Sequence, residues 1–188
     1  WPTGVATDGK RLAVADAYNN RVLIWNNFPE KNGQPADIVL GQPDFSSNLE
    51  AFPGKIISQE ERKRKHISWP WDVMIYQEKL FVISLDGSLL IWQKFPTQNY
   101  QSADMLLGQK NFAERFMGDI VKDNKRLYMK TPRSVSFDGN RHVVGDYNAA
   151  TIFIYKGLPI QDGQEADYII TPGIHKTGTG MILADGIT

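Results

Sequence analysis

Short apolar runs separated by polar turns fill the chain from its first residues. Positions 11–15 are Arg-Leu-Ala-Val-Ala, and positions 21–25 are Arg-Val-Leu-Ile-Trp, which is rich in β-branched and aromatic residues. Asp8-Gly9, Asn19-Asn20 and Asn32-Gly33 bound these runs as turn signals. The pattern therefore predicts four successive strands, at about residues 4–7, 11–15, 22–25 and 37–41.

The same pattern returns twice in register. Trp25 returns as Trp92 and as Tyr155, after shifts of 67 and 63 residues. Two further markers move by the same amounts: Phe28-Pro29 returns as Phe95-Pro96 and Leu158-Pro159, and Ala36-Asp37 returns as Ala103-Asp104 and Ala166-Asp167. A repeated four-stranded unit of about 40–50 residues is typical of a β-propeller blade.

The first copy also carries the signature of a family, in residues 4–9, 14–16, 19–25 and 32–45. This text resembles the NHL-repeat family of β-propellers, in particular its bacterial members. The second copy departs from it at residues 85–88 and the third at 149–151, so only the first copy has the family's Asn-Arg turn. Such proteins are often exported, so the resemblance implies an extracellular or periplasmic location, although the sequence shows no signal peptide.

The sequence thus predicts an all-β fold: a β-propeller segment of about three four-stranded antiparallel blades, half of a six-bladed ring, with short helical inserts between blades. The predicted division is blade 1 at 2–45, an insert at 46–69, blade 2 at 70–112, an insert at 113–131, blade 3 at 132–172, and a loop with the start of a further blade at 173–188.

An open half-ring leaves two blade faces without a neighbour, and a blade needs neighbours to bury its apolar surface. The remaining blades are therefore expected either in cis, in a longer propeller, or in a second chain that closes the ring. Residues 184–188, Ala-Asp-Gly-Ile-Thr, resemble the opening of another first strand and favour the first option.

Composition narrows the classes of function. The 188 residues suit one domain, and 41% hydrophobic content argues against disorder. Twenty-one basic and 21 acidic side chains give zero formal charge, so a nucleic-acid partner is disfavoured. No apolar run approaches the 18 or so residues of a membrane span. The absence of cysteine excludes disulfides and thiolate metal sites.

The most charged run lies in the first insert, at residues 58–66. Ser58 and Glu61 have the spacing of a capping box, which predicts a helix start. Its cations, Arg62, Lys63, Arg64 and Lys65, have two interpretations: a solvated helix, or a surface for an anionic partner.

Trp69 and Trp71 alternate around Pro70, so a strand there would place both on one face. They fit either the core between blades or a platform that stacks on a ligand. By analogy with propellers, the inserts and the turns between second and third strands share one face, where Tyr18, Asn19 and Asn20 lie. The candidate binding residues are therefore Tyr18, Asn19, Asn20, Arg62, Lys63, Arg64, Lys65, Trp69 and Trp71.

Catalytic motifs are missing from the sequence. The three histidines show no spacing typical of a metal site, and no phosphate loop or nucleophile elbow occurs. Asp72 is an inner-strand carboxylate without an equivalent in the other copies, which makes it a weak candidate metal ligand. Asp37, Asp104 and Asp167 are interpreted as acceptors of backbone N–H groups in turns.

The function predicted from these features is a non-catalytic NHL-type binding or scaffold module that recognises a protein or a glycan on its insert-bearing face, without a cofactor. One alternative is an enzyme, because the architecture also resembles propeller lyases and lactonases that hold a divalent ion, Ca or Zn, in the central channel. A second alternative is binding of single-stranded RNA, which the zero net charge disfavours.

Overall fold

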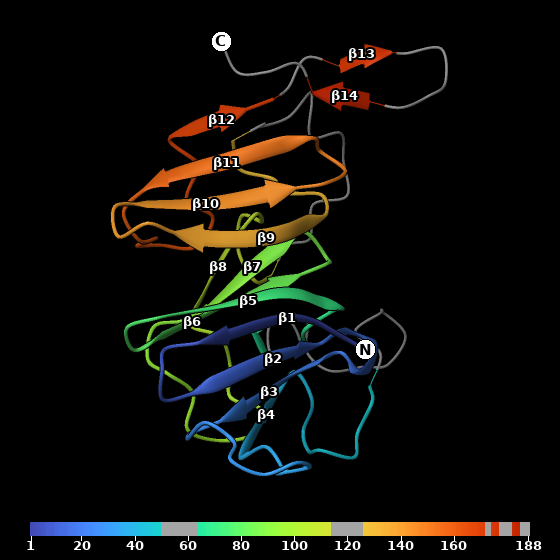
Figure 1. The fold of residues 1–188 in the computed structure, drawn as a ribbon. Helices are drawn as coiled ribbons and strands as arrows, with labels where there is room; N and C mark the ends of the chain where they lie inside the picture. The colour runs from blue at the N-terminus through green and yellow to red at the C-terminus, as the bar shows by residue number, and fades with distance from the viewer. Residues whose placement is uncertain (50–63, 114–125, 172–173, 177–181, 185–188) are drawn as a thin grey trace.

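The computed structural model describes residues 1–49, 64–113, 126–171, 174–176 and 182–184. Three four-stranded antiparallel sheets follow one another along the chain (Figure 1). The first holds β1 (Pro2–Thr7), β2 (Leu12–Asp16), β3 (Arg21–Trp25) and β4 (Ile38–Leu40), with the 3-10 turn η1 (Ala17–Asn19) between β2 and β3. The second holds β5 (Pro70–Tyr76), β6 (Lys79–Ser84), β7 (Ser88–Trp92) and β8 (Met105–Leu107). The third holds β9 (Pro132–Phe137), β10 (Arg141–Asp146), β11 (Thr151–Lys156) and β12 (Tyr168–Ile170).

The predicted all-β fold of three antiparallel blades is confirmed, and the chain is a partial β-propeller. The predicted helices around residues 58 and 116 lie largely outside the described residues. Of the described residues in these two inserts, Arg64 and Lys65 show helical backbone. Where a loop was predicted after blade 3, β13 (Ile174–Lys176) pairs with β14 (Ile182–Ala184) in a separate two-stranded sheet. The predicted further strand at 184–188 lies almost entirely outside the described residues.

The turn before each outer strand is held by the same two side chains in every blade. Asp37, Asp104 and Asp167 each accept a backbone N–H at 2.8 Å, from Asn26, Gln93 and Lys156. Gln34, Gln101 and Gln164 each accept another at 3.0 Å, from the residue four positions earlier. These bonds satisfy backbone N–H groups that the short outer strands do not pair. They confirm that the aspartates accept backbone N–H groups in turns.

The Leu-Gly-Gln sequence at the end of the outer strand in blades 1 and 2 has a steric origin. Gly108 has φ of +86°, and a Cβ there would lie 2.5 Å from the carbonyl oxygen of Gly87. The next residue, Gln109, donates from Nε2 to that same oxygen at 3.2 Å. Gly41 and Gln42 repeat the arrangement on the carbonyl of Asn20. Only glycine fits this close, left-handed approach.

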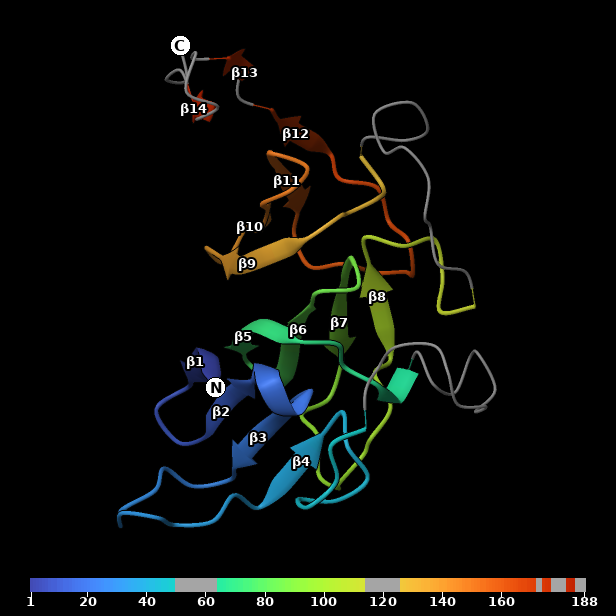
Figure 2. The same cartoon turned by 90° about the vertical axis from the view of Figure 1, so that its right-hand side faces the viewer.

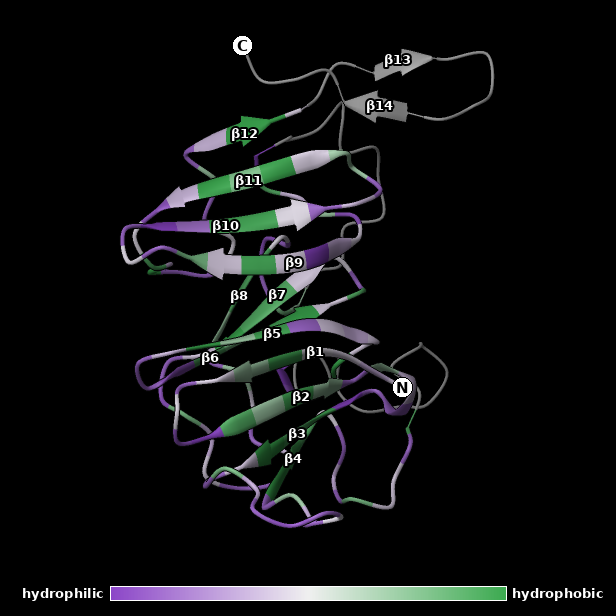
Figure 3. Ribbon diagram, in the orientation of Figure 1, coloured by the Kyte–Doolittle hydropathy of each residue, from purple (hydrophilic) through white to green (hydrophobic). Residues whose placement is uncertain are grey.

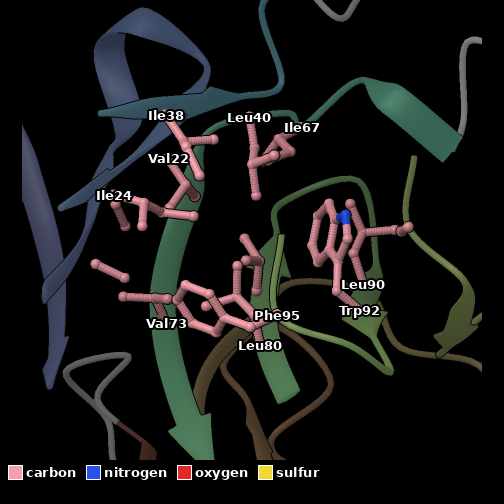
Figure 4. Close-up of a cluster of buried hydrophobic side chains, with 14 of the residues drawn as sticks. Val22, Ile24, Ile38, Leu40, Ile67, Val73, Leu80, Leu90, Trp92 and Phe95 are labelled. Atoms are coloured by element: carbon pink, nitrogen blue, oxygen red, sulfur yellow. The ribbon is translucent and has the colours of Figure 1, made fainter. Parts of the chain in front are cut away.

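The core consists of the layers between blades. One cluster joins blades 1 and 2 and includes Ile24 and Ile38 of blade 1 and Trp92 and Phe95 of blade 2 (Figure 4). A second cluster joins blades 2 and 3 and contains Tyr155. The apolar colouring runs along the middle strands of each blade (Figure 3). Trp92 and Tyr155 are fully buried, as expected for equivalent residues between stacked sheets.

Candidate functional site: the turn-bearing face

One end of the three blades gathers the turns between second and third strands and the chain segments that enter each blade. We call this end the turn-bearing face; it comprises residues 16–21, 84–88 and 146–151 together with residues 1–3, 64–71 and 126–133. It lies on the right of Figure 1, beside the N-terminus, and is turned to the viewer in Figure 2. The antiparallel strand order places the described residues that enter blades 2 and 3 from the predicted inserts, 64–69 and 126–131, at this end.

Three aromatic rings pack together on the first part of this face. Trp1 stacks on Tyr18 with ring centroids 5.1 Å apart and planes 7° from parallel. Trp69 packs on Tyr18 at 4.7 Å. Trp1 and Tyr18 are exposed, and Trp69 is half-buried. The rings give a rigid apolar surface at low entropic cost, which suits recognition of another molecule.

The two tryptophans do not share a strand face as predicted. Only Trp71 lies in β5, and Trp69, with φ of +42°, stands just before the strand, so strand alternation does not apply to the pair. Trp71 instead packs on the guanidinium of Arg133, which lies 4.4 Å from its ring centroid.

Arg133 is held between two aromatic rings. Its guanidinium lies 4.4 Å from the centroid of Trp71 and 4.2 Å from that of Tyr147. The β9 register shifts between its pairs with Gly145 and Asp146, so Arg133 stands in a β-bulge. Bulges re-aim a side chain out of the regular alternation. Within the described part of the chain, the buried Nε of Arg133 has no hydrogen-bond partner.

Asn19 and Asn20, predicted as binding residues, hold the turn of blade 1 together. Asn19 Nδ2 donates to Asp16 Oδ2 at 2.8 Å, and Arg21 Nε donates to the same oxygen at 2.8 Å. Asn20 is left-handed, with φ of 49°, and its Oδ1 accepts the backbone N–H of Trp69 at 3.0 Å. The turn of blade 1 at Asn20 thus links this blade to the entry of blade 2.

The charge of Asp16 is stabilised by this turn. Burial by itself would raise the pKa of Asp16, but the hydrogen bonds from Asn19 and Arg21 outweigh that effect and lower the pKa below its ordinary value. The carboxylate therefore stays ionised at neutral pH and keeps the turn ordered.

The basic run contributes its last two cations to the described structure, because Arg62 and Lys63 lie outside the described residues. Arg64 lies 4.3 Å from the ring centroid of Phe112, and Lys65 lies 5.2 Å from that of Tyr100. Both side chains are half-buried against blade 2, so they cover aromatic surface as well as carry charge.

Asp72, the weak candidate metal ligand, joins adjacent inner strands. Its Oδ2 accepts the N–H of Val135 in β9 at 3.0 Å, and its Oδ1 accepts the N–H of Val73 at 2.9 Å. Burial raises the pKa of Asp72, partly offset by these two hydrogen bonds. Among the residues that the structure describes, no group of three His, Asp or Glu side chains could hold a metal ion, and no helix is long and apolar enough to cross a membrane.

Sequence reasoning missed Arg133 and Tyr147. A signal for Arg133 was present: it follows Pro132, which opens blade 3, as Trp71 follows Pro70, which opens blade 2. The repeat therefore places both side chains at equivalent bulges. No sequence signal showed that Tyr147 would cover Arg133 from the other side.

No family model matches the chain, and no curated protein matches its sequence. Its structure is similar to the WD40 domain of Toxoplasma gondii coronin, with 13% identity and a TM-score of 0.48 over 81% of this chain and 31% of that one. It is similar to BamB from Moraxella catarrhalis, with 13% identity and a TM-score of 0.46 over 92% and 38%. The WD40 β-propeller domain of Doa1 gives 13% identity and a TM-score of 0.40 over 93% and 55%. The chain thus spans about a third to about half of the length of these β-propellers.

Proposed function

We propose that this chain is a non-catalytic, NHL-type β-propeller module that binds a protein partner on its turn-bearing face. The observation that carries the proposal is the position of Arg133, whose guanidinium lies between Trp71 and Tyr147. The NHL assignment rests on the residues of the first repeat. The choice of face rests on the exposed aromatic rings and the free cation described above.

The stacked guanidinium is prepared for an anionic group. Two aromatic contacts hold the planar guanidinium of Arg133, whose N–H groups form a donor edge. Nε, one of the donors on this edge, has no hydrogen-bond partner among the described residues. A carboxylate accepts two parallel N–H bonds from such an edge, which makes an acidic side chain or a C-terminal carboxylate of the partner the natural ligand.

The surroundings of Arg133 have the composition of a protein interface. Trp, Tyr and Arg are the residues that most often dominate binding energy at such interfaces. Tyr18 and Tyr147 are exposed, and Trp69 and Trp71, on either side of Pro70, belong to the same face. These groups would bury apolar area around the charged contact and exclude water from it.

Selection of random peptides on the immobilised chain, followed by titration of a selected synthetic peptide, tests the proposal. Arg133→Gln is expected to weaken the peptide at least about tenfold, and Tyr147→Ala by a smaller factor, since each removes part of one contact. Lys156→Gln is the matched control: Lys156 lies 5.3 Å from the ring centroid of Tyr168, at the opposite end of the blades. Selected peptides that bind all three variants as tightly as the original chain would refute the proposal.

The other functions considered from the sequence remain predictions with separate measurements. A glycan partner would appear as binding to immobilised oligosaccharides that Arg133→Gln abolishes. A propeller lyase or lactonase would retain stoichiometric Ca or Zn after purification. Single-stranded RNA binding would weaken steeply as salt is raised.

A further inference from the structure

A histidine is buried in the apolar layer at the junction between blades 2 and 3. His142 of β10 is 0% exposed, and its ring lies 5.5 Å from that of Phe81, on β6 of blade 2. Both of its ring nitrogens lack a hydrogen-bond partner in the described part of the chain. The equivalent position in blade 2 is Leu80, which packs in the cluster between blades 1 and 2. The second junction therefore has a titratable group where the first has a leucine.

The side chains that face His142 offer no negative charge. They are aromatic: Phe81 from β6, Tyr155 from β11, and Phe137 from β9, which itself packs on Tyr76 of β5. The charged side chains at this end of the same strands are exposed or bonded elsewhere: Glu78, Lys79, Asp138, Arg141 and Lys156. An imidazolium in this layer would therefore be a buried charge without a counter-charge from these elements, which is costly.

The Arg133 site spans the same junction. Trp71 belongs to β5 of blade 2, whereas Arg133 and Tyr147 belong to blade 3, whose strand β9 runs beside β5 (Figure 1). Trp71 also packs against the cluster that contains Phe81 and Tyr155, the two rings in contact with His142. The apolar layer around His142 therefore continues to the ring that holds Arg133.

Blade 3 is joined more firmly within itself than to blade 2. Backbone ladders connect β9, β10, β11 and β12. Across the junction, side-chain packing is supplemented by individual hydrogen bonds, from the N–H of Val135 to Asp72 and from the N–H of Leu106 to Asp162. In repeat proteins the interface between neighbouring units can open while each unit stays folded. Separation at this junction would carry Arg133 and Tyr147 away from Trp71.

We propose that the junction between blades 2 and 3 is an acid-sensitive switch that regulates partner binding at Arg133. The inference rests on the proposed function, because it concerns the same site. With His142 neutral, the blades are packed and Trp71, Arg133 and Tyr147 form one surface. Uptake of a proton by His142 separates the two blades and divides that surface. Acid therefore weakens binding, and by reciprocity a bound partner opposes the uptake of the proton.

The pH window follows from the burial of the ring. Burial lowers the pKa of His142 from 6.5 to about 4 in the packed junction, and exposure to water in the separated junction restores the ordinary value. The separated form thus binds a proton below pH 6.5 that the packed form does not bind until about pH 4. The opening equilibrium should rise about tenfold for each pH unit within this window.

Hydrogen exchange at two equivalent amides tests the switch. The N–H of Leu106 donates to Asp162 Oδ1 at 3.0 Å across the second junction, and the N–H of Val39 donates to Asn99 Oδ1 at 3.0 Å across the first. Between pH 6.5 and pH 4.5 the protection factor of Leu106 should fall about a hundredfold, and that of Val39 much less. His142→Leu should abolish the fall at Leu106, whereas any effect of acid on Asp162 is common to both proteins. The same fall at Leu106 in both proteins, or no fall in either, would overturn the proposal.

The peptide selected on the immobilised chain provides the second measurement. At about 100 times its dissociation constant it should raise the protection of Leu106 about a hundredfold at pH 5.5, because it binds the packed junction. Its dissociation constant should rise between pH 7 and pH 4.5 by a larger factor in the original chain than in His142→Leu, and equal rises would overturn the regulation. Peptide binding that Arg133→Gln leaves unchanged would contradict the proposed function itself, while the pH dependence at Leu106 would still report the opening of the junction.

Discussion

Replacement of His142 by leucine should remove much of the acid sensitivity of this protein. His142 pairs with Tyr155 across β10 and β11 and is 0% exposed. Its ring lies 5.5 Å from that of Phe81 and 5.6 Å from that of Tyr155, in the layer between blades 2 and 3. Neither ring nitrogen has a partner among the described residues. Leu12 and Leu80 occupy the equivalent positions in blades 1 and 2, so leucine suits the site.

The magnitude follows from the pKa. Burial lowers the pKa of His142 from 6.5 to about 4. The unfolded chain therefore takes up a proton below pH 6.5 that the folded chain refuses until about pH 4. Stability falls as pH drops through this window, by about 3 kcal/mol in total, and the loss levels off below it. His142→Leu has no such proton to bind and should lack this part of the loss.

Urea unfolding at pH 7.5 and pH 4, followed by tryptophan fluorescence, measures the effect. Other groups titrate in the same window, so the quantity to compare is the loss of unfolding free energy between the two pH values in each protein. The loss should be about 3 kcal/mol smaller in His142→Leu than in the original chain. Equal losses in the two proteins would refute the reasoning, because they would mean that the folded state accommodates the imidazolium.

Two further predictions concern backbone positions. Gly108→Ala should destabilise the chain by roughly 3 kcal/mol or more in chemical denaturation, because strain at positive φ adds to the close contact with the carbonyl of Gly87. The control Gly139→Ala has φ of +94° but nothing within 4 Å of the new Cβ, so it should cost only about 1–2 kcal/mol. Equal costs in the two variants would show that the close approach to Gly87 is unimportant. Asp72→Ala should lower the free energy of unfolding by about 1–3 kcal/mol and speed hydrogen exchange at the amide of Val135, because that amide loses its acceptor. An unchanged exchange rate at this amide would contradict the role given to Asp72.

The repeat was open to sequence reasoning because its determinants are local. A strand alternates apolar and polar positions over a few residues, and a turn needs its own acceptors. Asp37, Asp104 and Asp167 bond backbone N–H groups only 11 residues away in sequence, at identical distances. Such contacts recur wherever the text recurs, so three constant markers were enough to predict blade number and strand order.

The candidate site was predicted only in part. The antiparallel order of strands determines which turns share an end, so the face bearing Tyr18 and Trp69 followed from the topology. The role of Asn20 did not, because its partner Trp69 lies at the entry of the next blade, 49 residues away. Arg133 remained hidden because a β-bulge, which a strand pattern does not show, aims it at Trp71.

The sequence by itself determined the period, the turns and the apolar positions of each blade. Only the tertiary structure decided which copies of those positions are covered. Phe28 and Phe95 occupy the same place in the repeat, yet one is half exposed and the other buried. The physical reason is that burial belongs to a pair of neighbouring sheets, so the same residue is core or open surface according to whether another blade lies against it.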